Sequence, residues 1–438
     1  MTNKDPSHAR IARGGWQQRP APRWQDARRT LFINAQIFDG SGSALFPGEV
    51  LVVGNRIEAV AAGGESIERE GAAVIDCDGA TLMPGLVESH GHLSWPSSVG
   101  RVINAMHLPA EEHLLVTAYN ARVTLDHGFT SVYSAGALGA RLEIALKQEI
   151  AGGYLPGPRL RSSSLEKAAN GVAGVPQAHD GDHGEGVPAL RAYIAAMAGA
   201  GIDSVKFLLS SDDGFAPGAG QQLMYTEQEV AAIGMQARES GVWLACHAQA
   251  AEAVKQAVRH GFRSIYHCSY ADAEALDLLE SRKDEIFVSP AAGMLYARQH
   301  EAQAFGITPE VAERMGATSG LLRMREIYPE MKRRGIRVLP GGDYGFPYNP
   351  VGRNARDLDL FVRLFGFSPC EALMAATKWG GQLMDLQVGL VTPGYLADLL
   401  LVDGDPSADV TVLQDRNRLL MIMQDGKYHK WPLVQGDQ

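Results

Sequence analysis

The stretch Leu86-Val-Glu-Ser-His-Gly-His92 decides the fold class of this chain, because a short apolar run leads directly into two histidines. Apolar residues followed at once by polar ones are typical of a parallel strand whose carboxyl end carries functional groups. Side chains of an extended chain repeat every two residues, so His90 and His92 turn to the same face. The stretch therefore predicts a strand that carries two imidazoles at its carboxyl end.

Further short apolar runs alternate with amphipathic stretches over the following part of the chain. The additional strand candidates are Thr130–Ser134, Arg159–Ser162, Ser204–Leu208, Val242–Cys246, Ser264–Tyr266, Ile286–Ser289 and Arg337–Pro340. The helical stretches include Glu112–Asp126, Leu190–Ala200, Glu227–Ser240, Ala250–His260 and Ala273–Arg282. This alternation predicts an α/β fold, a (β/α)8 TIM barrel over residues 83–387. A doubly wound open sheet is the alternative.

Both ends of the chain are rich in short strands instead. Residues 30–34, 49–53 and 56–60 form apolar or alternating runs between turns, and residues 398–402 and 419–423 repeat this style. We therefore expect residues 30–82 and 388–438 to pair into one small β-sandwich domain. Residues 1–29 are basic and rich in proline and tryptophan, and we interpret them as a surface-draped arm. Alternatively, the arm docks on an acidic neighbouring subunit of a homo-oligomer.

Composition excludes several classes of protein. The chain has 438 residues, of which 45% are hydrophobic, and a net charge of −10, which disfavours nucleic acid and acidic membrane surfaces as partners. No apolar run is long enough for a transmembrane helix, and the first residues lack the apolar core of a secretory signal. Four widely spaced cysteines without a CxxC motif are typical of a reducing compartment. We therefore expect a cytoplasmic protein with a small-molecule substrate.

Polar residues follow other predicted strands as well. Lys206 lies within one, His247 and His267 end the next two, and Asp343 follows the last. The carboxyl ends of barrel strands converge on one mouth, however far apart they lie in sequence. Histidines and a carboxylate are suitable ligands for Zn²⁺ or a similar cation. The joint pattern predicts a metal site.

Lys206 and two cysteines have alternative interpretations. A lysine in an apolar strand is either ion-paired in the core, or it loses its proton beside metal cations and adds CO₂ to form a carbamate. Cys246 and Cys268 adjoin two of the proposed ligands. If His247 and His267 face the mouth, alternation turns their neighbours outward, so we expect buried, inert thiols.

The motif Met83-Pro-Gly-Leu-Val-Glu-Ser-His-Gly-His92 resembles the opening motif of the metal-dependent amidohydrolase superfamily. The chain is especially similar to the imidazolonepropionase-like and Xaa-Pro dipeptidase-like amidohydrolases. Supporting motifs are Asn34–Asp39, His127–Val132, Gly157–Leu160, Gly341–Asp343 and Leu390–Pro406. The resemblance covers most of the chain outside the arm.

The resemblance implies a ligand set of two divalent metal ions, expected to be Zn²⁺. It places His90, His92 and Asp343 on the first ion and His247 and His267 on the second. A carboxylated Lys206 then bridges both ions. The two ions share a hydroxide that attacks the substrate carbonyl, and Asp343 moves the proton to the leaving amine.

The chain departs from the family pattern at four positions. Glu88 stands where Asp is usual, and Ser134 where an acid is common. Asn170 and Gln249 stand where family members often carry histidine. Either these two act as neutral donors to the substrate carbonyl, or His179 or His183 of the same loop takes that role.

The loops after the later strands are expected to contact the substrate. Tyr296, Tyr344 and Arg353 are the candidates, beside Asn170, His179 and Gln249, and they suit a flat or apolar acyl group. The leading hypothesis is a binuclear hydrolase that cleaves an amide-type C–N bond, whether peptide-like, aryl amide, carbamoyl or urea. The alternatives are a ring-opening hydrolase of cyclic amides or a decarboxylase on the same fold, and a non-catalytic barrel scaffold.

Overall fold

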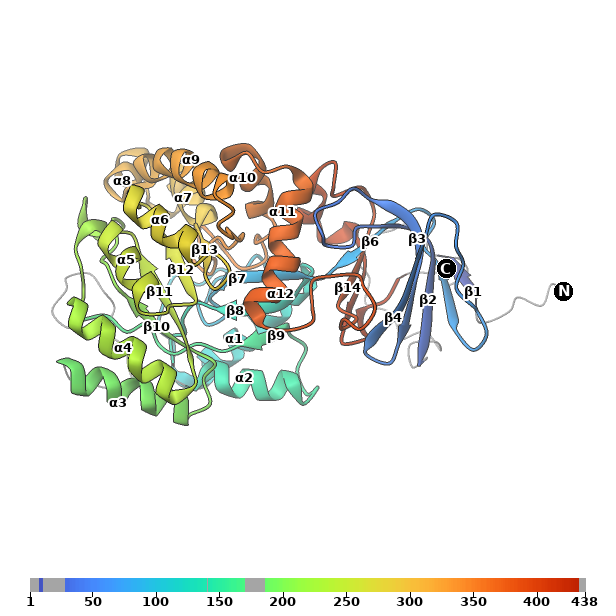
Figure 1. Ribbon diagram of the computed structural model, residues 1–438, viewed down its shortest axis with the longest axis horizontal. Helices are drawn as coiled ribbons and strands as arrows, with labels where there is room; N and C mark the ends of the chain where they lie inside the picture. Colours follow the sequence, from blue (N-terminus) through green and yellow to red (C-terminus); the bar gives the residue numbers. More distant parts are fainter. Residues whose placement is uncertain (1–7, 11–27, 140, 170–185, 433–438) are drawn as a thin grey trace. The chain divides into compact units, whose positions relative to one another are not determined.

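The computed structural model describes residues 8–10, 28–139, 141–169 and 186–432 (Figure 1). The chain divides into two compact units. The terminal unit is drawn from residues 1–87, 124–131 and 367–438, and the central unit from residues 88–123 and 132–366. Within the described residues, no helix is long and apolar enough to cross a membrane.

The terminal unit contains a sheet to which both ends of the chain contribute. Its described strands form one branched sheet in the order β1-β5-β2-β6-β14-β15-β16, with β3 pairing with β2 and β4. These strands are β1 (His8–Arg10), β2 (Arg29–Ile37), β3 (Phe46–Val53), β4 (Arg56–Ala62), β5 (Ala73–Asp76), β6 (Thr81–Pro84), β14 (Leu399–Val402), β15 (Leu419–Gln424) and β16 (Lys427–Lys430). The antiparallel pair β6–β14 sets Met83 opposite Leu400 and so joins the two ends.

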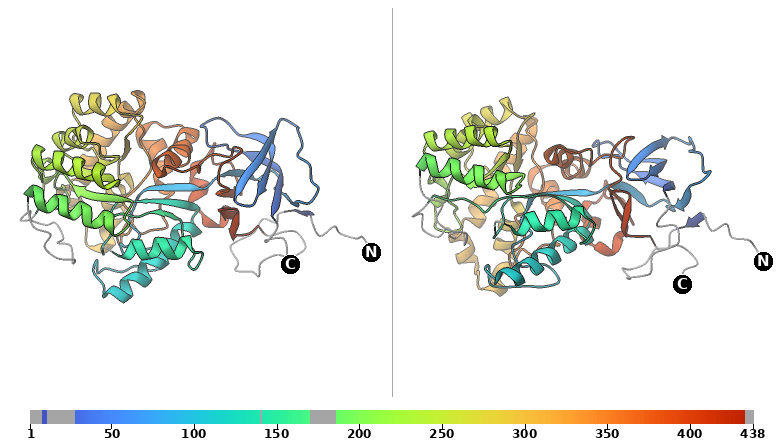
Figure 2. Two further views of the ribbon diagram at one scale, coloured as in Figure 1. Left: turned by 60° about the horizontal axis from the view of Figure 1, so that its bottom comes forward. Right: turned by 90° about the horizontal axis from the view of Figure 1, so that it is seen from below.

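The apolar core of this unit is likewise shared. Phe32 and Leu82 from the first segment pack in one cluster with Leu399 and Met421 from the last. Figure 2 shows these strands, blue and red, within one β-rich region. Helices α11 (Pro369–Ala376) and α12 (Lys378–Met384) belong to the same unit, together with the 3-10 turns at Val410–Gln414 and Arg416–Arg418.

Part of the basic arm belongs to this sheet. Residues His8–Arg10 form β1, which pairs in parallel with β5. Residues 1–7 and 11–27 lie outside the described residues. The described part of the arm is thus a strand, where the sequence suggested only a surface-draped segment.

The strands of the alternating middle lie in two further sheets. The first has the order β7-β8-β9, and the second, β10-β11-β12-β13, is parallel throughout. Their bounds are β7 (Leu86–Gly91), β8 (Phe129–Ser134), β9 (Arg159–Arg161), β10 (Ser204–Leu208), β11 (Trp243–Ala248), β12 (Ser264–His267) and β13 (Phe287–Ser289). The α/β class of the prediction is confirmed. The strand register sets Lys206 beside Ala245 and His247 beside Tyr266.

The hydrogen-bonded ladder of a closed barrel is not complete in the described residues. Single parallel bridges, Ser163 to Ser204 and Val288 to Val338, stand where full strand pairs were expected. The predicted eighth strand, Arg337–Pro340, is reduced to the bridge at Val338. Pro340 has no N–H to donate and two glycines follow it, so the ladder cannot continue there.

Helices connect these strands, and five of them, at residues 110–126, 186–199, 227–240, 251–259 and 273–281, correspond to the predicted stretches. The helices are α1 (Ala110–Asp126), α2 (Leu142–Ala151), α3 (Gly186–Gly199), α4 (Glu227–Ser240), α5 (Ala251–Arg259), α6 (Ala273–Ser281), α7 (Ala292–His300), α8 (Pro309–Arg314), α9 (Ala317–Arg333) and α10 (Arg356–Phe365), with short 3-10 turns at Ala219–Gln221 and Ala302–Phe305. In Figures 1 and 2, α4, α5 and α6 lie along the strands β10–β13. This arrangement leaves the carboxyl ends of the strands free to form a site.

Candidate active site

All six predicted metal ligands line one cavity of the central unit. The cavity has a volume of about 310 Å³, which suits a small-molecule ligand. The ligand candidates in its wall are His90, His92, Lys206, His247, His267 and Asp343. They come from the ends of β7, β10, β11 and β12 and from the loop after Val338, as expected for strands whose carboxyl ends converge.

The His-Gly-His motif is fixed by the residues packed against it. A Cβ atom at Gly91 would lie 2.4 Å from Cγ1 of Val132, so only glycine fits between the two histidines. Glu88 accepts a hydrogen bond from the backbone N–H of His90 (2.8 Å) and another from the amide of Asn354 (2.6 Å). Glu88 thus supports β7 from behind the site, where the family pattern has Asp.

The two imidazoles of β7 are held in set orientations. The His92 Nδ1–H donates to the carbonyl of Gly136 (3.0 Å), so Nε2 carries the lone pair. Nε2 lies 3.3 Å from Oδ1 of Asp343. The His90 ring stacks on Tyr266, with ring centroids 3.9 Å apart. Both rings are therefore positioned before any ligand binds.

The other two histidines lie against each other, with ring centroids 4.2 Å apart. Nε2 of His247 donates to the carbonyl of Ser211 (3.2 Å), which leaves its Nδ1 as the lone-pair atom. His267 has a φ of +75°, a left-handed conformation that is strained for a residue with a side chain. Strain of this kind is concentrated at functional sites.

Lys206 is buried in the wall of the cavity as an ion-paired amine. Its Nζ donates to the carbonyl of Ala135 (2.6 Å) and to the carboxylate of Glu166 (2.8 Å). The unmodified amine thus forms the ion pair, and carboxylation of Lys206 stays a prediction. The Glu166 side chain is 27% exposed, so it has room to turn away if the amine is carboxylated.

Asp343 also adopts a left-handed conformation, with a φ of +57°. Burial raises the pKa of its carboxyl to about 6, and the charge of Lys206 opposes this rise. The preceding Gly341 passes so close to β7 that a Cβ atom would lie 2.6 Å from Oγ of Ser89. The glycine pair thus lets the loop bring Asp343 against the histidines.

The buried histidines are poised as neutral ligands. Burial, and then the neighbouring positive groups, hold the pKa of His90 well below its ordinary value, and burial also lowers the pKa of His92 and His267. A metal binds the neutral imidazole, so these rings need to release no proton at neutral pH. The electrostatics of the cavity therefore suit a cation.

The donor set passes a simple test for metal binding. His90 Nδ1, His92 Nε2 and Asp343 Oδ1 are buried atoms with no hydrogen-bond partner among the described residues. Leaving one such group unpaired costs about 1–3 kcal/mol. One ligand atom from each of His90, His267 and Asp343 lies within 4.8 Å of the others. The residues present fit a divalent ion of the zinc type.

The two cysteines next to the ligands are buried away from the cavity. Neither Cys246 nor Cys268 lines the cavity, and both are fully buried. Burial raises the pKa of both thiols, which disfavours the thiolate that a metal would need. This geometry agrees with the inert thiols that alternation predicted.

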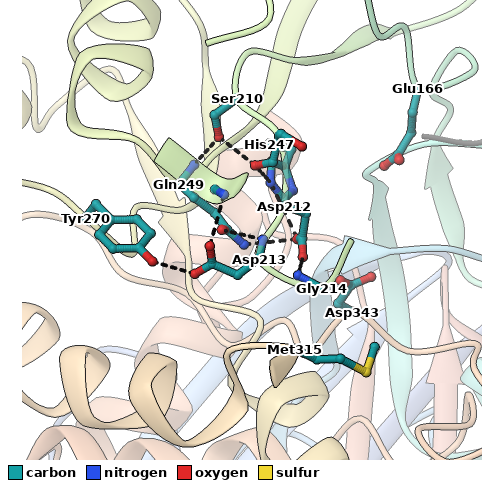
Figure 3. Close-up of polar contacts among 12 residues, drawn as sticks. Glu166, Ser210, Asp212, Asp213, Gly214, His247, Gln249, Tyr270, Met315 and Asp343 are labelled. Carbon is teal, nitrogen blue, oxygen red and sulfur yellow. Dashed lines mark hydrogen bonds and ion pairs between the residues drawn. The ribbon is translucent and has the colours of Figure 1, made fainter. Parts of the chain in front are cut away.

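Gln249 lies at the cavity wall in a polar cluster with two aspartates (Figure 3). Its amide donates to Asp212 (3.0 Å) and accepts from the backbone N–H of Asp213 (3.2 Å). Asp213 also accepts from the hydroxyl of Tyr270 (2.6 Å). Gln249 therefore braces the loop after β10, and both ends of its amide are engaged in the described structure.

The remaining predicted substrate contacts lie elsewhere. Tyr344 is buried and donates to Asp357 (2.6 Å), and Arg353 pairs with Glu301 (2.6 Å). Neither they nor Tyr296 belong to the described lining of the cavity. Asn170, His179 and His183 fall outside the described residues.

Two cavity residues escaped the sequence analysis. Glu166 and Asp212 both line the cavity. They follow β9 and β10 within a few residues, so polar residues placed after parallel strands were the available signal. Ser134 stands where family members commonly have an acid. A carboxylate from another segment lies at this place, because the Ser134 hydroxyl donates to the buried Glu143 of α2 (2.8 Å).

Fold and site together define an α/β protein with convergent metal-type ligands at the carboxyl ends of its strands. Residues 81–428 match the amidohydrolase family, so the chain belongs to this family and is a hydrolase. The resemblance drawn from the motifs is confirmed.

Individual relatives are more distant. The chain is 23% identical to the ochratoxinase of Aspergillus niger over 80% of this chain and 76% of the relative. It is 23% identical to the imidazolonepropionase of Sphingopyxis alaskensis over 92% and 97%. Among solved structures, a Xaa-Pro dipeptidase with methionine bound in its active site is similar with a TM-score of 0.79 and 25% identity, over 92% of this chain and 100% of that one.

Proposed function

We propose that this protein is a binuclear metal-dependent hydrolase that cleaves an amide-type C–N bond of a small molecule. The observation that carries the proposal is the single cavity lined by four histidines, a lysine and an aspartate from separate strands. The relatives, an ochratoxinase, a Xaa-Pro dipeptidase and an imidazolonepropionase, support a hydrolytic reaction.

In this proposal the described ligands divide into two sets. His90, His92 and Asp343 hold one ion, and His247 and His267 hold the other. Lys206, if carboxylated, would supply a further carboxylate ligand between the two sets. When bound, two such ions supply a Lewis acid for the carbonyl and a hydroxide nucleophile at neutral pH.

The residues of the chain then position the substrate and move protons. Asp343 carries a buried carboxylate whose pKa is raised to about 6 by burial, near the value expected of a general base. With Oδ1 held on the ion, the other oxygen of this carboxylate would take the proton of the nucleophile and pass it to the departing amine nitrogen. The fixed rings of His90 and His92 keep the Asp343 carboxylate aligned with the carbonyl group of the bound substrate.

The proposal is tested by metal content and turnover measured together. Protein reconstituted with Zn²⁺ and bicarbonate should bind about two ions per chain and hydrolyse N-acyl amino acids or anilides. A parallel panel of cyclic imides separates the ring-opening alternative, because only one group of substrates should turn over. Binding of less than one zinc ion per chain would refute the proposal.

A further inference from the structure

One buried arginine in the cavity wall has no anionic partner. Arg298 lies on α7, lines the cavity beside the metal-type ligands and is 9% exposed. Its Nη1 donates to the carbonyl of Met315 (3.3 Å), while its Nε is buried without a hydrogen-bond partner in the described structure. Burying a guanidinium without an ion-pair partner costs free energy, unless a bound ligand supplies the anion.

Of the nearby carboxylates, Asp343 lies against His92, and Asp212 is held within the loop after β10. Oδ2 of Asp212 accepts from Gln249 (3.0 Å), and its Oδ1 accepts from the backbone N–H of Gly214. The phenol oxygen of Tyr348 accepts a hydrogen bond from Arg298, but a phenol carries no charge at neutral pH. Among the described residues, no ion pair to Arg298 is formed.

The second arginine of the cavity differs in this respect. Arg323 pairs with Asp213 (3.2 Å), and its guanidinium lies over the ring of Tyr270, 4.1 Å from the centroid. Its charge is thus matched within the protein. Of these two arginines, Arg298 is therefore the one whose charge remains to be matched by a ligand.

The surroundings of Arg298 are apolar on the same helix face. Met294 and Leu295 lie about one turn before Arg298 on α7 and also line the cavity, as does Phe346 from the loop after Asp343. A ligand that reaches Arg298 must therefore carry an anion next to an apolar group. A planar guanidinium matches a carboxylate through two parallel N–H donors.

We infer that Arg298 is a specificity-determining residue that binds a free carboxylate of the substrate, and that the substrate class is the N-acyl amino acids with an apolar side chain. This inference rests on the proposed amide hydrolysis and narrows it. It separates this protein from a hydrolase of neutral amides, ureas or thiocarbamates, since such substrates leave Arg298 unmatched.

Binding can be tested without turnover. Calorimetry on the zinc-loaded protein compares 3-phenylpropanoate with 4-phenyl-2-butanone, its neutral isostere that cannot be hydrolysed. The wild type should favour the carboxylate by about 10- to 100-fold, the range of a charged hydrogen-bonded contact. Arg298→Met should remove this preference, and Arg298→Lys should restore part of it. Arg323→Met, which changes the matched arginine, should keep the preference.

The outcomes separate the inference from the proposed function. If Arg298→Met retains the preference, the anion binds at the metal ions instead, and the inference is overturned. A wild type that does not favour the carboxylate also overturns it. Turnover of N-benzoyl-L-phenylalanine, followed as benzoate release, tests the hydrolysis independently. In that assay Arg298→Met should raise KM about 10-fold or more and change kcat little.

Discussion

The Nε2 atom of His92 lies 3.3 Å from Oδ1 of Asp343, yet the two atoms form no hydrogen bond with each other or with any other described group. Two ligands of one tetrahedral zinc ion lie about 3.3 Å apart, because each is about 2.0–2.1 Å from the metal. The spacing is thus that of a ligand pair. A hydrogen bond would instead have aligned the two groups with each other.

Asp343→Asn should therefore abolish turnover while leaving the fold intact. Asparagine keeps the shape of Asp343 but cannot take a proton, so kcat should fall about 10²- to 10⁴-fold. Circular dichroism and the melting temperature should stay close to those of the wild type. Unchanged kcat would refute the role of Asp343 as the base.

The contact between Lys206 and Glu166 predicts a dependence on bicarbonate. Glu166 holds the charged amine, and carbamate formation must first release that ion pair. Glu166→Gln should therefore lower the bicarbonate concentration needed for full zinc loading, measured as metal content after dialysis. Glu149→Gln, an exposed change on α2, is the control. If bicarbonate has no influence on the metal content of either protein, Lys206 is not carboxylated.

The sequence predicted the local structure well where local chemistry determines it. Helix α4 was predicted with its observed bounds because Thr226 and Glu229 form a capping box and Gly241 ends the helix in a left-handed conformation. Strand β10 was likewise predicted in full. The eighth strand failed because a proline interrupts its hydrogen bonds at Pro340.

Site residues that lie along one strand were predicted from the sequence pattern. Site residues whose position depends on packing between segments were missed. Alternation along β11 correctly turned Cys246 away from the cavity, whereas Cys268 lies beyond β12 in a left-handed conformation and is absent from the cavity lining. Applied to Asp343, the same argument would have turned Tyr344 away too, and this residue is buried against Asp357. Glu166 reaches the cavity from a loop, where side-chain direction has no such simple period.

The four cysteines should differ sharply in reactivity. Cys77, Cys246 and Cys268 are buried, and Cys370 is partly exposed. A thiol reagent should therefore label Cys370 first in the native protein and all four after denaturation. Cys268→Ser should leave the zinc content unchanged. A loss of zinc would show that a thiol takes part in metal binding.

The buried carboxyl of Glu143 should make the stability of the central unit depend on pH. Burial raises its pKa from 4.5 to about 8, partly opposed by hydrogen bonds from Ser163 and Ser134. Below about pH 4.5 the group is protonated in both the folded and the unfolded chain, so the stabilisation is fully present. As pH rises towards 8, the unfolded chain loses the proton while the folded chain keeps it. The free energy of unfolding therefore falls over this window.

Glu143→Gln removes this titration, keeps an oxygen to accept from the Ser163 N–H and places an NH₂ group that can donate to the Ser134 hydroxyl. Relative to the wild type, the variant should gain about 2–4 kcal/mol of unfolding free energy between pH 5 and pH 8. Urea unfolding at several pH values measures the difference, and Glu149→Gln on the same helix should show no such trend. A parallel pH dependence of wild type and Glu143→Gln would mean that Glu143 is charged in the folded protein. In that case the two serine donors would outweigh the cost of its burial.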